Sequence, residues 1–229
     1  MTLLRHRDRL EGDLVIEVAF TDISLSLGDG AEAEVRDAAL EALATETGAT
    51  PVLMHQVHGA DAVLISGPGE APSCDTLITR QPGIALLARA ADCVPILLAD
   101  PATGWIAAVH SGRPGLAAGV LPAALAELRS RGAEPRTAWI GPHVCGSCYE
   151  VPREMQGEVA AMVPQARSTT SWGTPALDLG AGVRAQLEDA GITDVREVGA
   201  CTLEDPTWPS FRRDGAAATR FAGVIWSHA

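Results

Sequence analysis

Short runs of apolar residues, separated by turn-forming residues, recur along the chain and predict a protein rich in strands. Runs of roughly four to eight residues with many Val, Ile and Leu are typical of strands when Gly, Pro, Asn or Asp bound them. The segments that fit this description are 14–20, 52–58, 60–66, 76–79, 83–90, 94–100, 105–111, 137–141, 195–200 and 221–226. Because a DPATG turn joins 94–100 to 105–111, we expect these two strands to form a hairpin.

Other segments have the residue pattern of helices, and their positions help to define the fold class. The expected helices are 31–47, 116–132, 153–163 and 177–191. Gly48 and Gly132 close the first two of them, as is typical of helix ends. Since the strands are grouped along the sequence and several are neighbouring hairpins, the pattern favours an α+β fold over a doubly wound parallel sheet. We expect one domain over residues 1–229.

Composition and charge limit the classes of function. The chain has 229 residues, is 47% apolar and carries a net charge of −12. This acidic excess argues against a nucleic-acid partner, because a protein that follows phosphates needs a basic surface. No apolar run is long enough to cross a bilayer, and the charged N-terminal segment MTLLRHRDRLEGD lacks the apolar stretch of a secretory signal. We therefore expect a cytoplasmic protein with no membrane partner, whose five cysteines stay reduced.

The expected hairpin carries reactive side chains at its open end. In residues 91–115, ADCVPILLADPATGWIAAVHSGRPG, Cys93 precedes the first strand and His110 lies at the tail of the second. His55 and His58 are three residues apart, so on a strand they would point to opposite faces and only one would join this pair. Two imidazoles and one thiolate would leave a fourth coordination position open, as a catalytic zinc ion requires. His58, Cys93 and His110 are the candidate ligands.

Two other interpretations of these residues stay open on local sequence. Cys93 could attack a substrate as a thiolate, with His110 or His58 as its base. A buried cysteine and a hydrogen-bonded histidine in an ordinary core would give the same pattern. The metal interpretation is favoured over the covalent one, because Asp92, the adjacent acid, would face away from Cys93 on a strand.

Two polar clusters lie elsewhere in the sequence. Arg212, Arg213 and Arg220 stand in a C-terminal loop, where guanidinium groups suit a planar or phosphate-bearing ligand, although a solvated loop is the alternative. Cys145 and Cys148 form a Cys-x-x-Cys pair. A structural zinc site of the usual kind needs a second such pair, and a redox motif needs a thioredoxin-like context. We interpret these two cysteines as packing or loop residues.

Several motifs together make the chain similar to a known family. They are HQVHGADAVLI (55–65), CDTLIT (74–79), the run at 91–115, IGPHVCGSCYEV (140–151), DL…QLEDAGI (178–192) and CT…SFRRDG…R…GVIW (201–226). In this order they resemble the bacterial proteins once called multicopper polyphenol oxidases or laccase-domain proteins, and more recently described as purine nucleoside phosphorylases. The match covers most of the chain beyond residue 50, and ADCVP together with AVHxG is its specific part.

The resemblance implies a fold, a metal and an activity. The family fold is α+β, with two mixed sheets packed together and helices outside, in α/β/β/α layers. The second His of HQVH, the Cys of ADC and the His of AVHAG bind zinc in the family. This implies His58, Cys93 and His110 as zinc ligands here, with copper as the alternative metal. The implied reactions are phosphorolysis of adenosine, inosine and 5′-methylthioadenosine by phosphate, and deamination of adenosine.

The resemblance also suggests roles for residues around the metal. Arg212 and Arg213 match the double arginine of the family and are expected to line the substrate pocket. Asp75 and His55 are the candidates for the group that transfers a proton, next to Cys93 and His110 at the catalytic centre. The oligomeric state is not indicated by the sequence.

The chain departs from the family pattern at two cationic positions. Ile23 stands where an arginine is usual, and HSGRPG replaces HAGWRG, with Arg113 at the tryptophan position and Pro114 at the arginine position. Because the loss of an arginine from a desolvated phosphate clamp costs about 2–5 kcal/mol, we expect the metal ligands to persist while phosphorolysis is weakened. Arg113 is a candidate substitute on the phosphate. The alternatives are a Cys–His hydrolase, a copper-dependent polyphenol oxidoreductase and an inactive family member.

Overall fold

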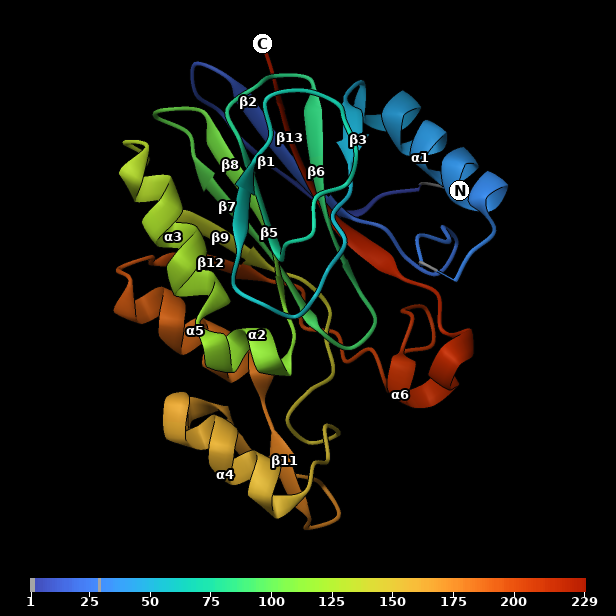
Figure 1. Cartoon of the computed structure of the whole chain (residues 1–229), viewed down its shortest axis with the longest axis vertical. Coiled ribbons are helices and arrows are strands. Elements are labelled where there is room, and N and C mark those ends of the chain that lie inside the picture. Colours follow the sequence, from blue (N-terminus) through green and yellow to red (C-terminus); the bar gives the residue numbers. More distant parts are fainter. Residues whose placement is uncertain (1–2, 29) are drawn as a thin grey trace.

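Two mixed β-sheets form the centre of the computed structural model, which describes residues 3–28 and 30–229 (Figure 1). The first sheet has the spatial order β1 (Arg5–Leu10), β2 (Val15–Phe20), β13 (Phe221–His228), β6 (Ile84–Ala90) and β3 (Thr50–Val52). The second has the order β12 (Asp194–Glu197), β9 (Thr137–Ile140), β7 (Val94–Asp100), β8 (Trp105–Ser111), β5 (Thr76–Thr79) and β4 (Ala62–Leu64). Most pairs are antiparallel, and β3–β6, β9–β12 and β4–β5 are parallel. The expected α+β fold is confirmed.

Helices and a small hairpin complete the architecture. The helices are α1 (Ala33–Thr47), α2 (Arg113–Ala118), α3 (Val120–Ser130), α4 (Arg153–Met162), α5 (Leu179–Asp189) and α6 (Phe211–Asp214). Strands β10 (Arg167–Thr169) and β11 (Pro175–Leu177) pair with each other outside both sheets, and single 3₁₀ turns lie at Pro164–Ala166 and Gly215–Ala217. Among the described residues, no helix is long and apolar enough to span a membrane.

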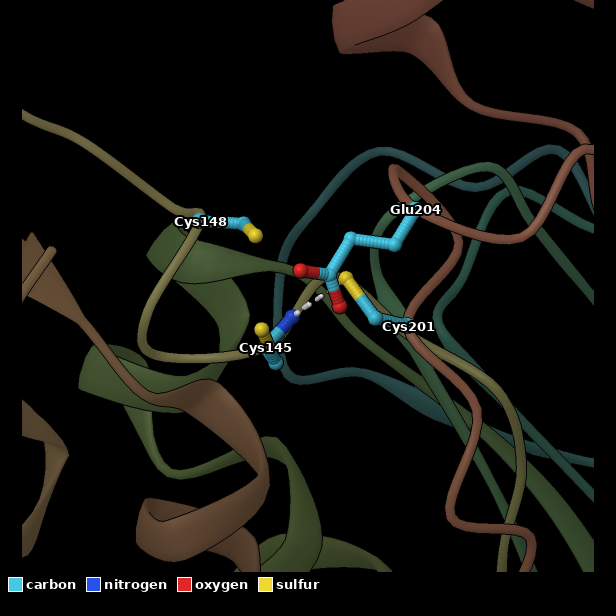
Figure 2. A group of neighbouring side chains, drawn as sticks. All are labelled: Cys145, Cys148, Cys201 and Glu204. Atoms are coloured by element: carbon cyan, nitrogen blue, oxygen red, sulfur yellow. Dashed lines mark hydrogen bonds between the residues drawn. The ribbon is translucent and has the colours of Figure 1, made fainter. Parts of the chain in front are cut away.

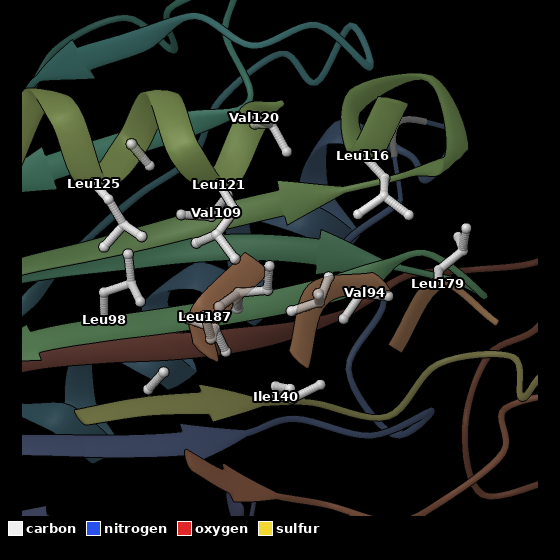
Figure 3. Packing of buried hydrophobic residues seen from close by; sticks show 14 of the residues in the cluster. Val94, Leu98, Val109, Leu116, Val120, Leu121, Leu125, Ile140, Leu179 and Leu187 are labelled. Atoms are coloured by element: carbon white, nitrogen blue, oxygen red, sulfur yellow. The ribbon is translucent and has the colours of Figure 1, made fainter. Parts of the chain in front are cut away.

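Three apolar clusters lie between neighbouring layers and hold them together. Leu43 of α1 packs in one cluster with Trp226 of β13, which places α1 on the outer face of the first sheet. Phe20 and Leu97 belong to the cluster between the two sheets. The third cluster joins the outer face of the second sheet to α2, α3 and α5 (Figure 3). The layers are therefore helix, sheet, sheet and helices, the α/β/β/α arrangement that the family resemblance implied.

The helix expected over 116–132 is two helices, because the chain turns at Gly119. This glycine has φ of +78° and is the C-cap of α2, where its N–H donates to the carbonyls of Gly115 and Leu116. A left-handed residue ends a helix, and glycine adopts this conformation at no steric cost. The short α2 is thereby separated from α3 and lies directly after β8, next to the open end of the hairpin.

Strands β6 and β7 follow each other in sequence but belong to different sheets. The chain crosses from one sheet to the other through residues 91–93, where Asp92 has φ of +86°. A non-glycine residue in this region is uncommon and is held there by its surroundings. Two hydrogen bonds hold Asp92: its Oδ1 accepts one from the Thr202 hydroxyl at 2.7 Å, and its Oδ2 accepts one from the Arg212 amide at 2.7 Å. The crossing places Cys93 at one end of the packed sheets.

Candidate metal centre and adjoining pocket

The hairpin of β7 and β8 brings Cys93 and His110 together, as its sequence predicts. Pro95 pairs with His110 in this ladder, and Val94 pairs with Ser111. His110 is buried, with 2% of its surface exposed, and Cys93 is half-buried. His110 lies within β8 and Cys93 directly precedes β7, and all residues of these two strands except Trp105 are buried, so the core fixes both backbone positions.

His58 reaches the same point from the loop between β3 and β4. It has φ of +60°, and the carboxylate of Asp75 holds this strained turn. The Asp75 oxygens accept hydrogen bonds from the backbone amides of Val57 at 3.2 Å, His58 at 3.0 Å and Gly59 at 2.6 Å. Of the expected strand over 52–58, only Val52 belongs to β3. The amides at 57–59 are bound by the buried carboxylate of Asp75 and not by a neighbouring strand.

Gly112 allows the three side chains to meet. A Cβ atom at this position would lie 2.4 Å from Cδ2 of His58 and 3.0 Å from Sγ of Cys93. The first contact is shorter than real Cβ contacts and the second is tight, so a larger residue would displace the His58 ring and crowd Cys93. The glycine of the HSGRPG stretch is thus required by close approach.

Asp75 also orients His110. Its Oδ1 lies 2.8 Å from Nδ1 of His110, which favours the tautomer with a proton on Nδ1 and leaves Nε2 free to act as a ligand. Burial lowers the pKa of His110, and the charge of His58 lowers it further, although the hydrogen bond to Asp75 acts in the opposite direction. Burial would raise the pKa of Asp75, but hydrogen bonds from His110 and the Gly59 amide bring it below its usual value. A neutral imidazole backed by an ionised carboxylate is the usual arrangement around a metal-binding histidine.

The donor atoms of His58, Cys93 and His110 all lie within 4.8 Å of one another. Nε2 of His58 is 3.7 Å from Sγ of Cys93, and ordinary zinc bond lengths in a tetrahedron place nitrogen and sulfur ligands about 3.5 Å apart. The two imidazole rings meet edge to face, with centroids 4.8 Å apart. The donor set fits a zinc ion with three protein ligands and one open position.

The chemistry of Cys93 favours a ligand over a nucleophile. Burial, followed by the nearby Asp92 carboxylate, raises the pKa of Cys93 to about 12. A nucleophilic cysteine needs a lowered pKa and a cationic neighbour, which is the opposite environment. A metal ion removes this difficulty, because it deprotonates a coordinating thiol directly.

A pocket of about 400 Å³ opens onto these three side chains. The residues that line it are Gln56, His58, Arg89, Ala90, Ala91, Asp92, Cys93, His110, Tyr149, Phe211, Arg212 and Arg220. The guanidinium of Arg212 lies 4.3 Å from the centre of the Tyr149 ring, and that of Arg220 lies 5.9 Å from the Phe211 ring. The pocket therefore combines a metal-ligand group with flat aromatic surfaces and cationic groups, a combination suited to a planar ring that is joined to an anionic or hydroxylated part.

Of the other candidate residues, some lie on the pocket wall and some lie behind it. Asp75 lies behind His110 rather than on the pocket wall, and Arg212 is on the wall. Arg213 points away: its guanidinium donates to the carbonyls of Thr202 at 2.9 Å and Trp208 at 2.8 Å, and it pairs with Asp214. Arg213 thus positions the loop that carries Arg212.

Two further candidates lie outside the set of lining residues. Arg113 begins α2, directly after the hairpin and Gly112. His55 is exposed and forms an isolated β-bridge with Ser73. Between them, only Arg113 is near the pocket wall, since its charge acts on Tyr149.

Sequence reasoning missed several residues that the pocket contains. Arg89 belongs to the apolar strand segment GIALLARA and reads as part of a core, yet its Nη1 and Nη2 each donate at 2.9 Å, to the carbonyls of Leu27 and Met54. Gln56 pairs through its amide with the backbone of Arg89. Tyr149 lies within IGPHVCGSCYEV (140–151), a stretch that carries the family resemblance, and this placement is the available signal. Burial raises the pKa of Tyr149, which keeps its hydroxyl protonated at neutral pH.

Comparisons with known proteins show the family of this chain. A family model described as multi-copper polyphenol oxidoreductase laccase matches residues 8–228. A purine nucleoside phosphorylase of Streptomyces coelicolor is 45% identical over 226 residues, which is 96% of this chain and 93% of that protein. Another, of Deinococcus radiodurans, is 36% identical over 179 residues, which is 75% of this chain and 68% of that protein.

Solved structures show the same fold. A Neisseria meningitidis protein of the family model DUF152 superposes with a TM-score of 0.84 at 25% identity, covering 98% of this chain and all of that one. YlmD from Geobacillus stearothermophilus superposes with a TM-score of 0.85 at 23% identity, over the whole of both chains. The packing of the two sheets is therefore found in proteins of low sequence identity.

Proposed function

The chain belongs to the multi-copper polyphenol oxidoreductase laccase family, and we propose that it is a cytoplasmic, zinc-dependent enzyme that acts on purine nucleosides. The observation that carries this proposal is the group formed by His58, Cys93 and His110 at one side of a pocket that also contains Tyr149 and Arg212. Relatives named purine nucleoside phosphorylase support the substrate class. A phosphorylase needs room for a nucleoside and phosphate together, and about 400 Å³ lies within the range of small-molecule sites.

Different pocket residues suit the purine ring and the phosphate. The aromatic faces of Tyr149 and Phe211 suit a purine ring, because stacking on a flat ring is favourable for any base. Arg212 and Arg220 supply positive charge for phosphate. In phosphorolysis the bond from ribose C1′ to purine N9 breaks, a phosphate oxygen bonds to C1′, and the departing base takes up a proton.

The ligands of the metal would be His58, Cys93 and His110, with Asp75 holding His110 in the required tautomer. When bound, zinc would supply Lewis acidity at this end of the pocket. Asp75 is buried and engaged by four donors, so we assign it to positioning. Deamination of adenosine would proceed in the same pocket, with water adding its oxygen at C6 and ammonia leaving.

We further propose that phosphorolysis is weakened relative to deamination. Ile23 and Pro114 stand at positions where the family pattern has arginines. Isoleucine and proline carry no charge, so neither position offers a cationic group to an anion. An arginine contact that a bound substrate desolvates is worth about 2–5 kcal/mol, which is about 30-fold to a few thousand-fold in phosphate binding or rate. Arg212 and Arg220 remain to hold phosphate.

A panel of nucleosides tests the proposal. Zinc-loaded protein is incubated with adenosine, inosine or 5′-methylthioadenosine, with and without phosphate, and the bases and nucleosides are separated by chromatography. We expect adenosine to give inosine in either buffer, and inosine to give hypoxanthine slowly and only with phosphate. His58→Asn, in which asparagine tolerates the left-handed backbone, should abolish both reactions.

Two outcomes would contradict parts of this proposal. Rapid phosphate-dependent cleavage of inosine at low phosphate concentration would exclude the weakened phosphate site. No turnover of any nucleoside by protein that contains zinc would exclude the purine nucleoside activity. A copper-loaded sample with a phenol as substrate, run in parallel, separates the nucleoside enzyme from a polyphenol oxidoreductase.

A further inference from the structure

A second group of metal-binding side chains lies outside the pocket described above. Cys145, Cys148, Cys201 and Glu204 each offer one donor atom, and these atoms all lie within 4.8 Å of one another. Figure 2 shows the three sulfur atoms and the Glu204 carboxylate turned toward a common point. All four residues differ from those of the first group, and none of them lines the pocket next to it.

The backbone brings the two halves of this group together. Cys145 and Cys148 stand at the two ends of a turn after β9, in which the Cys148 amide donates to the Cys145 carbonyl at 3.0 Å. Cys201 lies on the loop after β12, which is aligned with the first segment by an isolated parallel bridge between His143 and Cys201. The Cys145 amide also donates to Sγ of Cys201 at 3.4 Å (Figure 2). A backbone N–H directed at a sulfur is a contact that supports a thiolate ligand.

The donor set is complete for a tetrahedral ion. Three sulfur atoms and one carboxylate oxygen are four ligands, and zinc bond lengths put two thiolates of a tetrahedron about 3.7 Å apart. Donor atoms that already lie within 4.8 Å need only small side-chain rotations to reach that spacing. Cys148 is buried, Cys145 and Cys201 are half-buried, and Glu204 is exposed, so the sulfur atoms are shielded while the carboxylate closes the site from the solvent side.

We propose that Cys145, Cys148, Cys201 and Glu204 bind a structural zinc ion. Four protein ligands leave no position for a substrate, and a site rich in sulfur selects zinc among the common divalent ions. The sequence has no second Cys-x-x-Cys pair, because the third and fourth ligands come from a loop more than fifty residues away. All five cysteines of the chain are free thiols, so the three in this group are available as ligands.

The ion would join two segments that form one wall of the pocket. Tyr149 directly follows Cys148, and Thr202 directly follows Cys201. The Thr202 hydroxyl binds Asp92, and its carbonyl accepts a hydrogen bond from Arg213. A zinc ion at this point therefore fixes the loop of Tyr149 relative to the loop that leads to Arg212.

Metal content per chain tests the proposal. Full-length protein is purified under reducing conditions with zinc present, freed of loosely bound metal, and analysed by mass spectrometry for metals. We expect about two zinc ions per chain in the natural protein, and about one in each of Cys201→Ser and His58→Asn, because each variant removes one of two separate sites. Cys74→Ala removes a buried cysteine that belongs to neither group and should retain both ions.

Stability gives a second readout that does not depend on activity. Loss of a structural ion destabilises the folded state, so Cys201→Ser should lower the thermal midpoint by roughly 5 °C or more, and added zinc should not restore it. Cys201→Ser that keeps two ions, or a Cys145–Cys201 disulfide found in reduced preparations of the natural protein, would overturn the proposal. If His58→Asn loses zinc and Cys201→Ser does not, the first site is supported and the second is excluded.

Discussion

The two groups of candidate metal ligands are built in different ways. His58, Cys93 and His110 are held by the ends of buried strands and by a carboxylate, Asp75, that fixes both the turn of His58 and the ring of His110. The second group, Cys145, Cys148, Cys201 and Glu204, stands on two loops that meet through an isolated bridge. The first group offers three donor atoms and faces a pocket of about 400 Å³, whereas the second offers four.

This difference indicates a catalytic role for the first group and a structural role for the second. A site with an open coordination position, placed on a rigid scaffold, can bind and activate a ligand without moving its own residues. A site with a full set of protein ligands between loops has no position left for a substrate, and its effect is to hold those loops in place. We therefore expect the first group to control turnover and the second to control the shape of the pocket wall.

The largest effect is expected from exchanging one cysteine in each group. Cys93→Ala removes a ligand of the first group and should lower kcat/KM by more than about 100-fold, because even residues that only support metal ligands are worth about 10–100-fold. Steady-state kinetics with adenosine, with the zinc content measured on the same sample, checks this. A variant with full zinc content and full activity would exclude Cys93 as a ligand.

Cys201→Ser is the matched variant in the second group. It should raise KM for the nucleoside by about 3–10-fold and change kcat little, because it loosens the loops that carry Tyr149 and Arg212 without touching the reacting atoms. A fall in kcat as large as that of Cys93→Ala would show that the two groups do not differ in role.

Asp75→Asn should give an intermediate effect, through zinc affinity. The amide cannot hold His110 in the Nδ1-protonated tautomer as the carboxylate does, and loss of such a supporting partner weakens metal binding by about 10–100-fold. Titration of zinc against a competing chelator measures the change, and the second group should be unaffected.

Asp100 provides the control for this measurement. It is a buried aspartate at the opposite end of the same hairpin, and it accepts hydrogen bonds from the amides of Ala102 at 3.0 Å and Glu134 at 2.8 Å. Asp100→Asn changes a carboxylate of similar burial that contacts no ligand, so zinc affinity should stay within about twofold of the natural protein. Equal losses in both variants would assign the effect of Asp75 to stability alone.

The comparison also explains which parts of the fold the sequence predicts. Strands β6, β7 and β8 are fully or almost fully buried, so their apolar runs are unambiguous. Strand β1, RHRDRL, is an edge strand with mostly exposed side chains, and it carries no apolar alternation. Its position depends on distant partners, such as the bond from Trp139 to Asp8 at 2.7 Å and the ion pair of Asp8 with Arg196. The local sequence pattern does not reveal contacts between residues so far apart in the chain.

The same limit applies to the two sites. Cys93 and His110 can be paired from sequence because one short turn joins their strands, and His58 joins them through the family resemblance. Cys201 and Glu204 cannot be paired with Cys145 by spacing, since the intervening chain contains α4, the β10–β11 hairpin and α5. The pocket residue Arg89 is hidden for another reason: it is a charged residue within a strand of otherwise apolar core positions.

The smallest effect is expected at His55, the first histidine of the HQVH motif, which the sequence offers as a proton-transfer group and the structure places outside the pocket-lining set. Both histidines are exposed, but His58 lines the pocket beside Cys93 and His110, while His55 pairs through its backbone with Ser73 and lies outside the pocket-lining set. His55→Ala should therefore keep kcat/KM within about twofold and leave the pH profile unchanged, as surface substitutions away from a site usually do. Rates measured between pH 5 and 9 check both statements. A loss of one limb of the pH profile would make His55 the proton-transfer group, and would mean that the loop from 53 to 57 moves toward the pocket when a nucleoside binds.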